Sequence, residues 1–218
     1  MLELYFAPGA CSFVPHAGLE TIKAATGTVF ESKLVKLHKG EHKTPEYLAM
    51  NPNGQVPVLV VDGKPLTQIV AICDFLDRSF PQAGMLPADT WSRAQALSQL
   101  AWMNNTAHPT FTHVFRTGEF AESEAAQADV RKVAAARFRI YLERIQSWVA
   151  SAAPYWFGAR VTFHDAYAFT LFRWGGYAGV DPKSLPGYLA YVERVMAAAP
   201  VAATLERERI KLDTYKAA

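Results

Sequence analysis

NPNGQVPVLVVDGKPLT, at residues 51–67, is the stretch of sequence that decides the expected fold. Its opening NPNG is typical of a turn, and residues 56–61 form a valine-rich run that favours a β-strand. Asp62-Gly63 then predicts a hairpin, with a short second strand at residues 65–67. The stretch therefore predicts two neighbouring antiparallel strands.

Regular elements are expected on both sides of this hairpin. In chain order they are a strand at 2–6, a helix at 12–26 that stops at Gly27, a strand at 29–37, a short helix from Thr44-Pro45-Glu46 and, after the hairpin, a helix at 68–79. A helical crossover makes the first two strands parallel, whereas the hairpin strands are antiparallel. The order predicts a mixed four-stranded sheet with helices on its faces.

The remainder of the chain has helical patterns. Pro81, Gly84 and Pro87 lie in a segment that is typical of a linker. We therefore expect an α/β domain at residues 1–81, a linker at 82–89 and an all-helical domain at 90–218. Its expected helices lie at 91–115 with a bend near His108-Pro109, at 122–151, at 165–174 in the core, at 185–199 and at 201–211.

Composition excludes several classes of protein. The 22 basic and 20 acidic side chains give a net charge of +2 without long single-sign runs, which argues against a nucleic-acid partner. No apolar run reaches the length of a membrane span, and the N-terminus lacks the features of a signal peptide. The presence of two cysteines favours a reducing compartment, so we expect a cytoplasmic protein.

Cys11 is the first candidate for chemistry. It follows a strand and a Pro-Gly loop and opens a helix, where free backbone N–H groups and the helix dipole favour an anion. We therefore expect a lowered thiol pKa. The alternative is that Cys11 is a small buried hydrophobic residue. Cys73 lies on the apolar face of a helix, where core packing explains it.

Pro57 and the start of the helix at 68–79 are the next candidates. A cis Val56–Pro57 bond would turn the Val56 N–H and C=O toward an extended ligand, whereas an edge-strand proline would need no ligand. Thr67 is expected to be the helix N-cap, and the N–H groups after it suit a carboxylate. Capping alone explains Thr67 equally well.

The remaining polar candidates have two interpretations each. His108 either faces a cleft or is an ordinary polar helix residue, and Tyr5 either donates its O–H to a bound thiolate or is a half-buried strand residue. His38 and His42 have the spacing of metal ligands but lack a third ligand nearby, so no metal site is expected. Thr162 to Asp165 matches a structural capping box.

Four stretches of this sequence resemble a known family. They are residues 4–12, LYFAPGACS; residues 51–57, NPNGQVP; residues 66–72, LTQIVAI; and residues 162–167, TFHDAY. Over its full length the chain resembles the bacterial cytosolic glutathione S-transferases, especially the beta class, which carries an active-site cysteine. The resemblance implies a thioredoxin-like N-terminal domain, a helical C-terminal domain and a homodimer.

The resemblance also implies roles for individual residues. It implies that glutathione is the co-substrate, with Cys11 and His108 as catalytic residues. Val56 would pair with the cysteinyl part of glutathione, Lys39 would reach its glycine end, and Asn104 would approach the sulfur and the peptide. The implied glutathione-binding set is Tyr5, Lys39, Val56, Pro57, Gln68, Ile69 and Asn104.

Gln68-Ile69 departs from the family pattern, which usually has an acidic residue followed by a small one. Gln68 keeps a hydrogen-bonding carbonyl but lacks the charge that answers the γ-glutamyl ammonium, and the Ile69 side chain is expected to crowd the site. A charged hydrogen bond contributes about 1.5–3 kcal/mol, so glutathione affinity is expected to fall about ten- to a hundredfold.

Two functions follow from this reading. The first is a transferase that conjugates or reduces a small hydrophobic electrophile with glutathione, with Phe111, Phe115 and Trp174 as candidates for the substrate wall or for the core. A dithiol oxidoreductase is disfavoured because Val14 stands where a second cysteine would be. The alternative is a non-catalytic protein on the same fold that binds hydrophobic ligands or serves as an interaction module.

Overall fold

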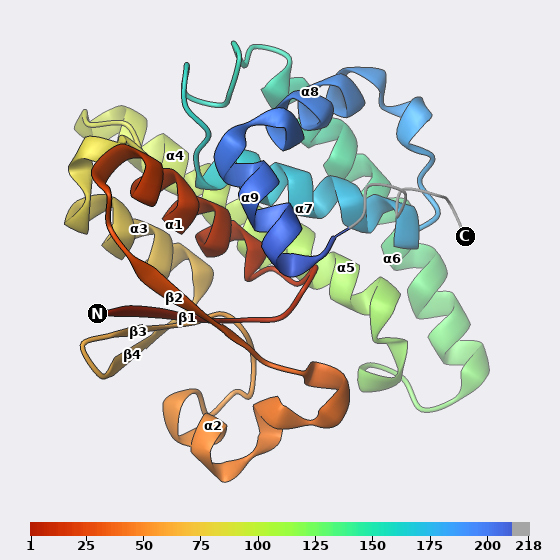
Figure 1. The fold of residues 1–218 in the computed structure, drawn as a ribbon. Helices are drawn as coiled ribbons and strands as arrows, with labels where there is room; N and C mark the ends of the chain where they lie inside the picture. The colour runs from red at the N-terminus through yellow and green to blue at the C-terminus, as the bar shows by residue number, and fades with distance from the viewer. Residues whose placement is uncertain (211–218) are drawn as a thin grey trace.

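The computed structural model describes residues 1–210, and these begin with the predicted mixed sheet. Its strands lie in the order β2-β1-β3-β4 (Figure 1). β1 pairs with β2 in parallel, while β3 is antiparallel to both β1 and β4. The strands are β1 at Leu2–Phe6, β2 at Phe30–Leu34, β3 at Val58–Val61 and β4 at Lys64–Thr67.

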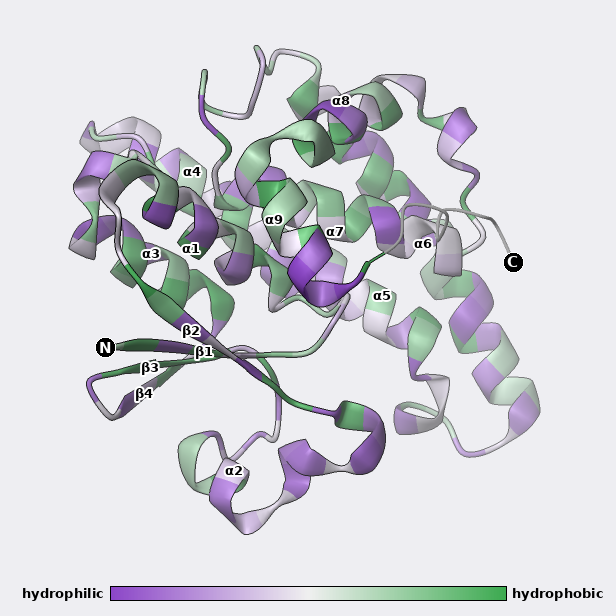
Figure 2. Ribbon diagram, in the orientation of Figure 1, coloured by the Kyte–Doolittle hydropathy of each residue, from purple (hydrophilic) through white to green (hydrophobic). Residues whose placement is uncertain are grey.

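Helices cover both faces of the sheet. Helices α1 (Phe13–Thr26) and α3 (Ile69–Ser79) lie on one face, and the short α2 (Pro45–Met50) lies beyond the other (Figure 1). Alternation along β1 explains the arrangement, since Leu4 packs into the main core and its neighbour Tyr5 contacts a smaller cluster on the opposite side. Hydrophilic residues dominate the segment that leads into α2 (Figure 2).

Among the element boundaries that differ from the expectation are the start of α3 and the end of β2. Thr67 is the last residue of β4 and is not a helix N-cap. Gln68 occupies that position, with a φ of 72° and no capping hydrogen bond from its side chain. The second strand stops at Leu34, because the following residues form two short 3-10 turns that meet at Gly40, whose φ is 74°.

Every later element in the described part of the chain is helical. The principal elements are α4 (Thr90–Trp102), a π-helical turn (Met103–Ala107), α5 (His108–Phe115), α6 (Glu124–Val149), α7 (Phe163–Tyr177), α8 (Pro186–Ala197) and α9 (Ala199–Glu208). Lys211, the last residue of the expected closing helix, lies outside the described residues. Among residues 1–210, no helix is both long and apolar enough to cross a membrane.

The long helix expected at residues 91–115 is interrupted by a π-helical turn next to the position where the sequence predicts a bend. The His108 N–H donates to the Met103 carbonyl, which closes a π-helical turn before α5. Pro109 has no N–H to donate to the preceding turn, so the regular ladder is interrupted at this point. The interruption includes Asn104 and ends at His108, which are two of the predicted site residues.

Helix α7 is the centre of the helical part and packs against α1. It is buried from Phe163 to Gly176, and the capping box between Thr162 and Asp165 is present as predicted. Gly18 of α1 faces the Phe163 ring so closely that an added Cβ would lie 2.2 Å from it. One continuous core therefore joins the sheet to the helical part.

A salt-bridge cluster ties the two parts together across the expected linker. Arg93 of α4 donates to Asp77 of α3 at 2.6 Å and also pairs with Asp74. Asp77 accepts a further hydrogen bond from the Leu86 N–H at 2.9 Å. The start of the helical part is thereby fixed to the last helix of the α/β part.

Candidate active site

Cys11 lies in the turn between β1 and α1, beside the predicted cis-proline peptide. The turn is closed by the Phe13 N–H, which donates to the Ala10 carbonyl at 3.1 Å. The Val56–Pro57 bond is cis, as predicted. The Cys11 thiol donates to the Val56 carbonyl, with an S···O distance of 3.5 Å. Cys11 and the cis-proline peptide are therefore in direct contact.

The acidity of Cys11 differs from the prediction. Burial raises the pKa of its thiol to about 12, because loss of water outweighs the backbone N–H groups of Cys11 and Ser12 and the positive charge of Arg116, which act in the opposite direction. The expectation of a lowered pKa was therefore wrong. Cys11 is nevertheless partly exposed, whereas Cys73 is buried in the core as predicted.

The helical part contributes a chain of three hydrogen-bonded side chains. The Tyr167 hydroxyl donates to the Asn104 amide oxygen at 3.2 Å and meets His108 Nδ1 at 3.0 Å. With its hydroxyl proton committed to Asn104, Tyr167 accepts from His108, so His108 carries its proton on Nδ1 and leaves Nε2 as an acceptor. Burial lowers the pKa of His108 to about 4, so the ring is neutral at neutral pH.

Two residues near the thiol were not predicted as site residues. Tyr167 lies close enough that the charge of a Cys11 thiolate raises its pKa, after the larger effect of burial. Arg116, just after α5, lowers the pKa of Cys11, His42 and His108. The sequence offers two signals for these residues: Tyr167 is a hydroxyl in an apolar helix, and Arg116 is a cation at a helix end. Both features are common outside active sites, so neither identifies a site residue.

The segment before Val56 is held by α2 and the residue that follows it. The Tyr47 hydroxyl and the Asn51 amide both donate to the Gln55 carbonyl, at 2.8 Å and 2.7 Å. Tyr5 lies on this side of the sheet, with its ring edge-on to Tyr47 at 6.2 Å between centroids. The geometry therefore places Tyr5 with the supports of the Val56 segment, on the face away from the main core.

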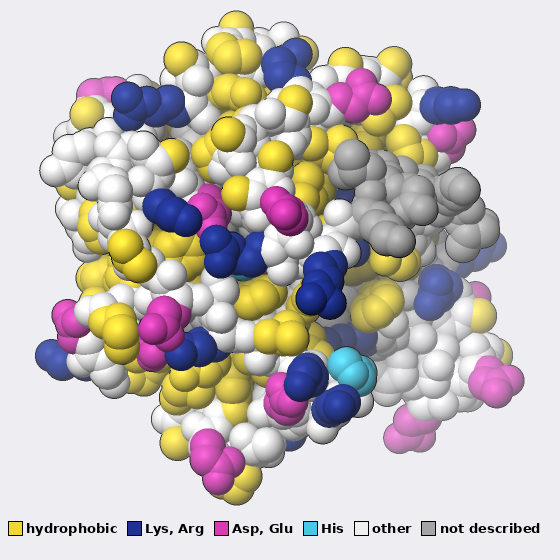
Figure 3. Space-filling view, viewed as in Figure 1, with side chains coloured by type: hydrophobic (Ala, Val, Ile, Leu, Met, Phe, Trp, Pro, Cys, Tyr) yellow, Lys and Arg dark blue, Asp and Glu magenta, His cyan; other side chains and the backbone are white. Residues whose placement is uncertain are grey.

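The other predicted glutathione contacts differ in exposure. Lys39 is exposed at the end of a 3-10 turn. Figure 3 shows Lys or Arg side chains together with a histidine over the segment of 3-10 turns that precedes α2. Gln68 is exposed, whereas the Ile69 side chain is buried in the main core. Ile69 is the first residue of α3, where its backbone N–H is available. Its side chain points into the core, contrary to the expectation that it would crowd the site.

The aromatic candidates for a substrate wall separate into core and surface residues. Phe111 and Trp174 are buried and stack at 4.5 Å between ring centroids. Phe115 is 59% exposed and packs edge-on against the partly exposed Tyr177 at 6.2 Å. Phe115 and Tyr177 therefore offer the accessible aromatic surface at this end of α5 and α7.

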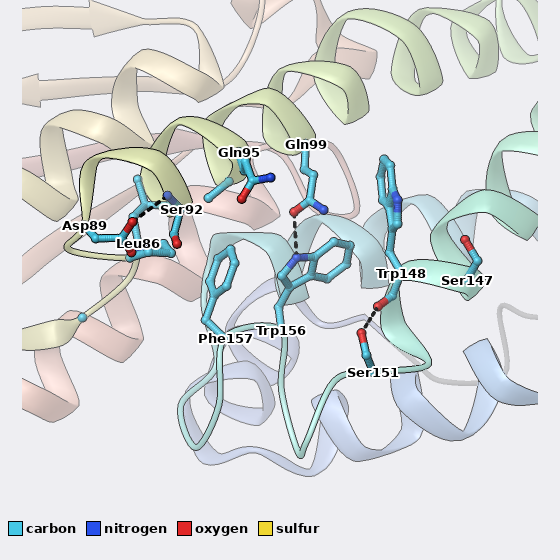
Figure 4. Close-up of a pocket in the computed structure, with 13 residues that line it drawn as sticks. Leu86, Asp89, Ser92, Gln95, Gln99, Ser147, Trp148, Ser151, Trp156 and Phe157 are labelled. Carbon is cyan, nitrogen blue, oxygen red and sulfur yellow. Dashed lines mark hydrogen bonds between the residues drawn. The ribbon is translucent and has the colours of Figure 1, made fainter.

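A pocket of about 650 Å³ lies elsewhere in the helical part. It opens between the start of α4, the end of α6 and the loop before α7 (Figure 4). Trp156 lines it and donates its indole N–H to Gln99 at 3.1 Å. None of the predicted site residues contributes to its lining, so it is separate from the Cys11 site. Residues 1–210 contain no cluster of three or more metal-ligating side chains.

The mixed sheet places a cysteine before its first helix and beside a cis-proline peptide, and a helical domain follows it. This combination defines a thioredoxin-like thiol-binding protein with a helical extension. Residues 2–78 match the family model described as glutathione S-transferase, N-terminal domain. The chain is 32% identical over 214 residues to glutathione S-transferase GST-4.5 of Xanthomonas campestris pv. campestris, over 95% of this chain and 98% of that protein.

Other relatives agree with this match. Glutathione S-transferase GstA of Escherichia coli O157:H7 is 31% identical over 216 residues, covering 96% of this chain and all of the relative. A glutathione transferase homologue from Sulfitobacter, solved with bound glutathione, has a TM-score of 0.84 at 28% identity, over 95% of this chain and 98% of its own. The chain belongs to the glutathione S-transferase family, which confirms the resemblance seen in the sequence.

Proposed function

We propose that this chain joins the sulfur of glutathione to an electrophilic carbon of a small hydrophobic compound, with Cys11 as a catalytic residue. The observation that carries the proposal is the contact between the Cys11 thiol and the Val56 carbonyl at 3.5 Å. It brings a sulfur–hydrogen donor and a cis-proline peptide to the same point. Whole-chain similarity to named glutathione S-transferases supports an enzyme over the non-catalytic alternative.

Glutathione would bind as an added strand along the Val56 peptide. Its cysteinyl N–H and C=O would pair with the C=O and N–H of Val56. Lys39 would meet the glycine carboxylate, while the Ile69 N–H and the Gln68 side chain would meet the γ-glutamyl group. Asn104 and His108 would close the other side of the sulfur. Tyr5 and Pro57 would keep the Val56 segment in place from the sheet.

Binding in this way would redirect the Cys11 thiol. When the glutathione N–H donates to the Val56 carbonyl, the Cys11 S–H would turn from this shared acceptor to the charged glutathione sulfur, which is the stronger acceptor. The raised pKa of Cys11 suits this role, because a thiol that keeps its proton can donate to a neighbouring thiolate. Cys11 would therefore act as a hydrogen-bond donor and not as the attacking nucleophile.

The reaction is a substitution at carbon. The glutathione thiol releases its proton to water, and its sulfur forms a bond to the electrophilic carbon. The bond from that carbon to its leaving group breaks, and the leaving group departs with the electron pair, as chloride does from a chlorinated aromatic compound. The aromatic surface of Phe115 and Tyr177 would hold the electrophile.

Several wider properties belong to the same proposal. We place the glutathione site in the domain at residues 1–81, joined by residues 82–89 to the helical domain at 90–218. Homodimerisation and a role in detoxification are typical of the family and are extended here to this chain. Cys11 and Cys73 are both free thiols, which supports a reducing compartment, so we assign the protein to the cytoplasm.

Cys11→Ala tests the proposal, with Cys73→Ala as the matched loss of a thiol in the core. Wild type and both variants should be retained on immobilised glutathione. With chlorodinitrobenzene as acceptor, Cys11→Ala should lose about ten- to a hundredfold in kcat/KM, because a hydrogen bond to a charged sulfur contributes about 1.5–3 kcal/mol. Cys73→Ala should keep the wild-type value.

Mass spectrometry after incubation with oxidised glutathione provides a second measurement. Any glutathione joined to the wild type through a disulfide should be absent from Cys11→Ala, while circular dichroism shows the fold intact. Glutathione still attached to that variant, or an unchanged kcat/KM, would defeat the assignment of Cys11. Failure of the wild type to bind the resin and to turn over the acceptor would defeat the transferase itself.

A further inference from the structure

The Gly9 peptide, two residues before Cys11, is held from three directions by side chains of the helical part. Its N–H donates to Glu208 Oε2 at 3.0 Å. Its carbonyl accepts from Arg173 Nη1 at 2.9 Å and from the Trp174 indole N–H at 3.1 Å. Helices α7 and α9 therefore fix both backbone polar groups of Gly9, which belong to two successive peptide units of the thiol-bearing turn.

Glu208 is also the middle of a buried polar chain. Its second carboxylate oxygen lies 2.8 Å from His16 Nδ1, and both side chains are 0% exposed. His16 Nε2 in turn lies 3.0 Å from the Ser32 hydroxyl. The carboxylate thus links the last described helix, the first helix and the second strand of the sheet. Such a connected and dry network holds its members in one arrangement.

Between Gly9 and Cys11 the turn has little freedom. Gly9 has a φ of +71°, and an added Cβ would lie 2.5 Å from the Arg173 guanidinium. On the other side of Cys11, the Ser12 hydroxyl accepts from the Ala7 N–H at 3.1 Å and donates to the Ala7 carbonyl at 3.2 Å. The position of the sulfur is therefore set by the ends of this turn, one of which is held by the helical part.

We propose that Glu208 is a positioning residue which, through the Gly9 peptide, sets the place and the reactivity of the Cys11 sulfur. The inference rests on the proposed function in one respect, because it takes Cys11 as a catalytic residue. Glu208 touches neither the thiol nor a substrate in this arrangement; it acts through the backbone and through its charge.

The charge of Glu208 acts on the thiol in a defined direction. It raises the pKa of Cys11, while Arg116 at the end of α5 lowers it. Tyr47 from α2 and Tyr167 from α7 also face the thiol, and both remain neutral because burial raises their pKa. Removing the negative charge should therefore favour the thiolate.

The carboxylate itself is surrounded by groups that favour its ionised form. Burial raises the pKa of Glu208, and His16 from α1, the Gly9 N–H and Arg173 from α7 act against that rise. A glutamine at position 208 keeps an oxygen for the Gly9 N–H and offers an N–H to the unprotonated Nδ1 of the other His16 tautomer. Glu208→Gln therefore removes the charge and preserves the contacts.

The test measures alkylation of Cys11 by iodoacetamide across a range of pH, without glutathione, by mass spectrometry of the Cys11 peptide. Glu208→Gln should react about three- to tenfold faster than wild type near pH 8, because each unit by which the thiol pKa falls increases the thiolate fraction about tenfold. Glu206→Gln is the control, since Glu206 lies on the same helix but is exposed. It should follow the wild-type profile.

Glu208→Ala tests the positioning itself. Without an acceptor for the Gly9 N–H, the turn should loosen and kcat/KM for conjugation should fall at least about tenfold, with recovery in the glutamine variant. An alkylation profile of Glu208→Gln that coincides with that of Glu206→Gln would overturn the proposal. If the wild type lacks transferase activity but the alkylation shift is present, the proposed function fails and the role of Glu208 stands.

Discussion

Gly9→Ala should destabilise the protein by about 2 kcal/mol more than Gly27→Ala, although the two glycines have nearly the same backbone conformation. Gly9 has a φ of +71° and Gly27 a φ of +74°. An alanine in this left-handed region costs about 1 kcal/mol at either position. The pair therefore separates backbone strain from contacts made by the added methyl group.

The contacts differ sharply between the two positions. A Cβ at Gly27 meets nothing within 4 Å, whereas a Cβ at Gly9 lies 2.5 Å from Arg173 Nη2 and 2.7 Å from Nη1. The guanidinium must move and give up its 2.9 Å hydrogen bond to the Gly9 carbonyl. Loss of a charged hydrogen bond costs about 1.5–3 kcal/mol, which gives the expected difference.

Urea unfolding of both variants and the wild type measures this difference. All three should be compared at one protein concentration, because the apparent stability of an oligomer depends on concentration. The variant at position 9 should also lose transferase activity, since its added methyl group displaces the turn that carries Cys11. Equal destabilisation by the two substitutions would refute the claim that Arg173 holds the Gly9 peptide.

Two further predictions concern charges in the helical part. Burial lowers the pKa of His164 to about 4, so the unfolded chain takes up a proton at higher pH than the folded chain does. The free energy of unfolding should therefore decline by up to about 3 kcal/mol as the pH falls from about 6.5 to 4. In urea titrations across this range, His164→Gln should lose the part of the pH dependence that His164 contributes. A wild-type slope in the variant would contradict this. Arg93→Gln should lower the free energy of unfolding by about 2 kcal/mol, because it leaves the nearly buried Asp77 without its cation. Arg78→Gln should lower it by under about 0.5 kcal/mol, because the Arg78 side chain is 67% exposed. Similar losses in the two variants would show that the salt bridge between α3 and α4 contributes little to stability.

Local sequence signals were sufficient for most of the fold. The Asp62-Gly63 hairpin, the stop at Gly27 and the cis Val56–Pro57 bond all occur where the sequence predicts them. The N-cap at Thr67 was wrong because β4 extends through it, and pairing of Thr67 with Val58 depends on a partner strand, not on capping preference. Local sequence patterns therefore predict that an element exists more reliably than they predict the residue at which it ends.

The site was harder to predict because its energetics depend on distant residues. The lowered pKa expected for Cys11 follows from a helix start alone, whereas its burial depends on the whole surrounding fold. Arg173, Trp174 and Glu208 reach Gly9 from more than 160 residues away in the sequence. No motif spacing records such contacts, so the residues that hold the turn were absent from the predicted site.

The hydrogen bond between Gly9 and Glu208 has a consequence for synthesis of the chain. Translation proceeds from the N-terminus, so the sheet and its first helix emerge long before α9. The carboxylate that contacts the Cys11 turn is supplied by Glu208, 199 positions after Gly9. A nascent chain that has not yet reached residue 208 therefore lacks this contact to the turn that carries Cys11.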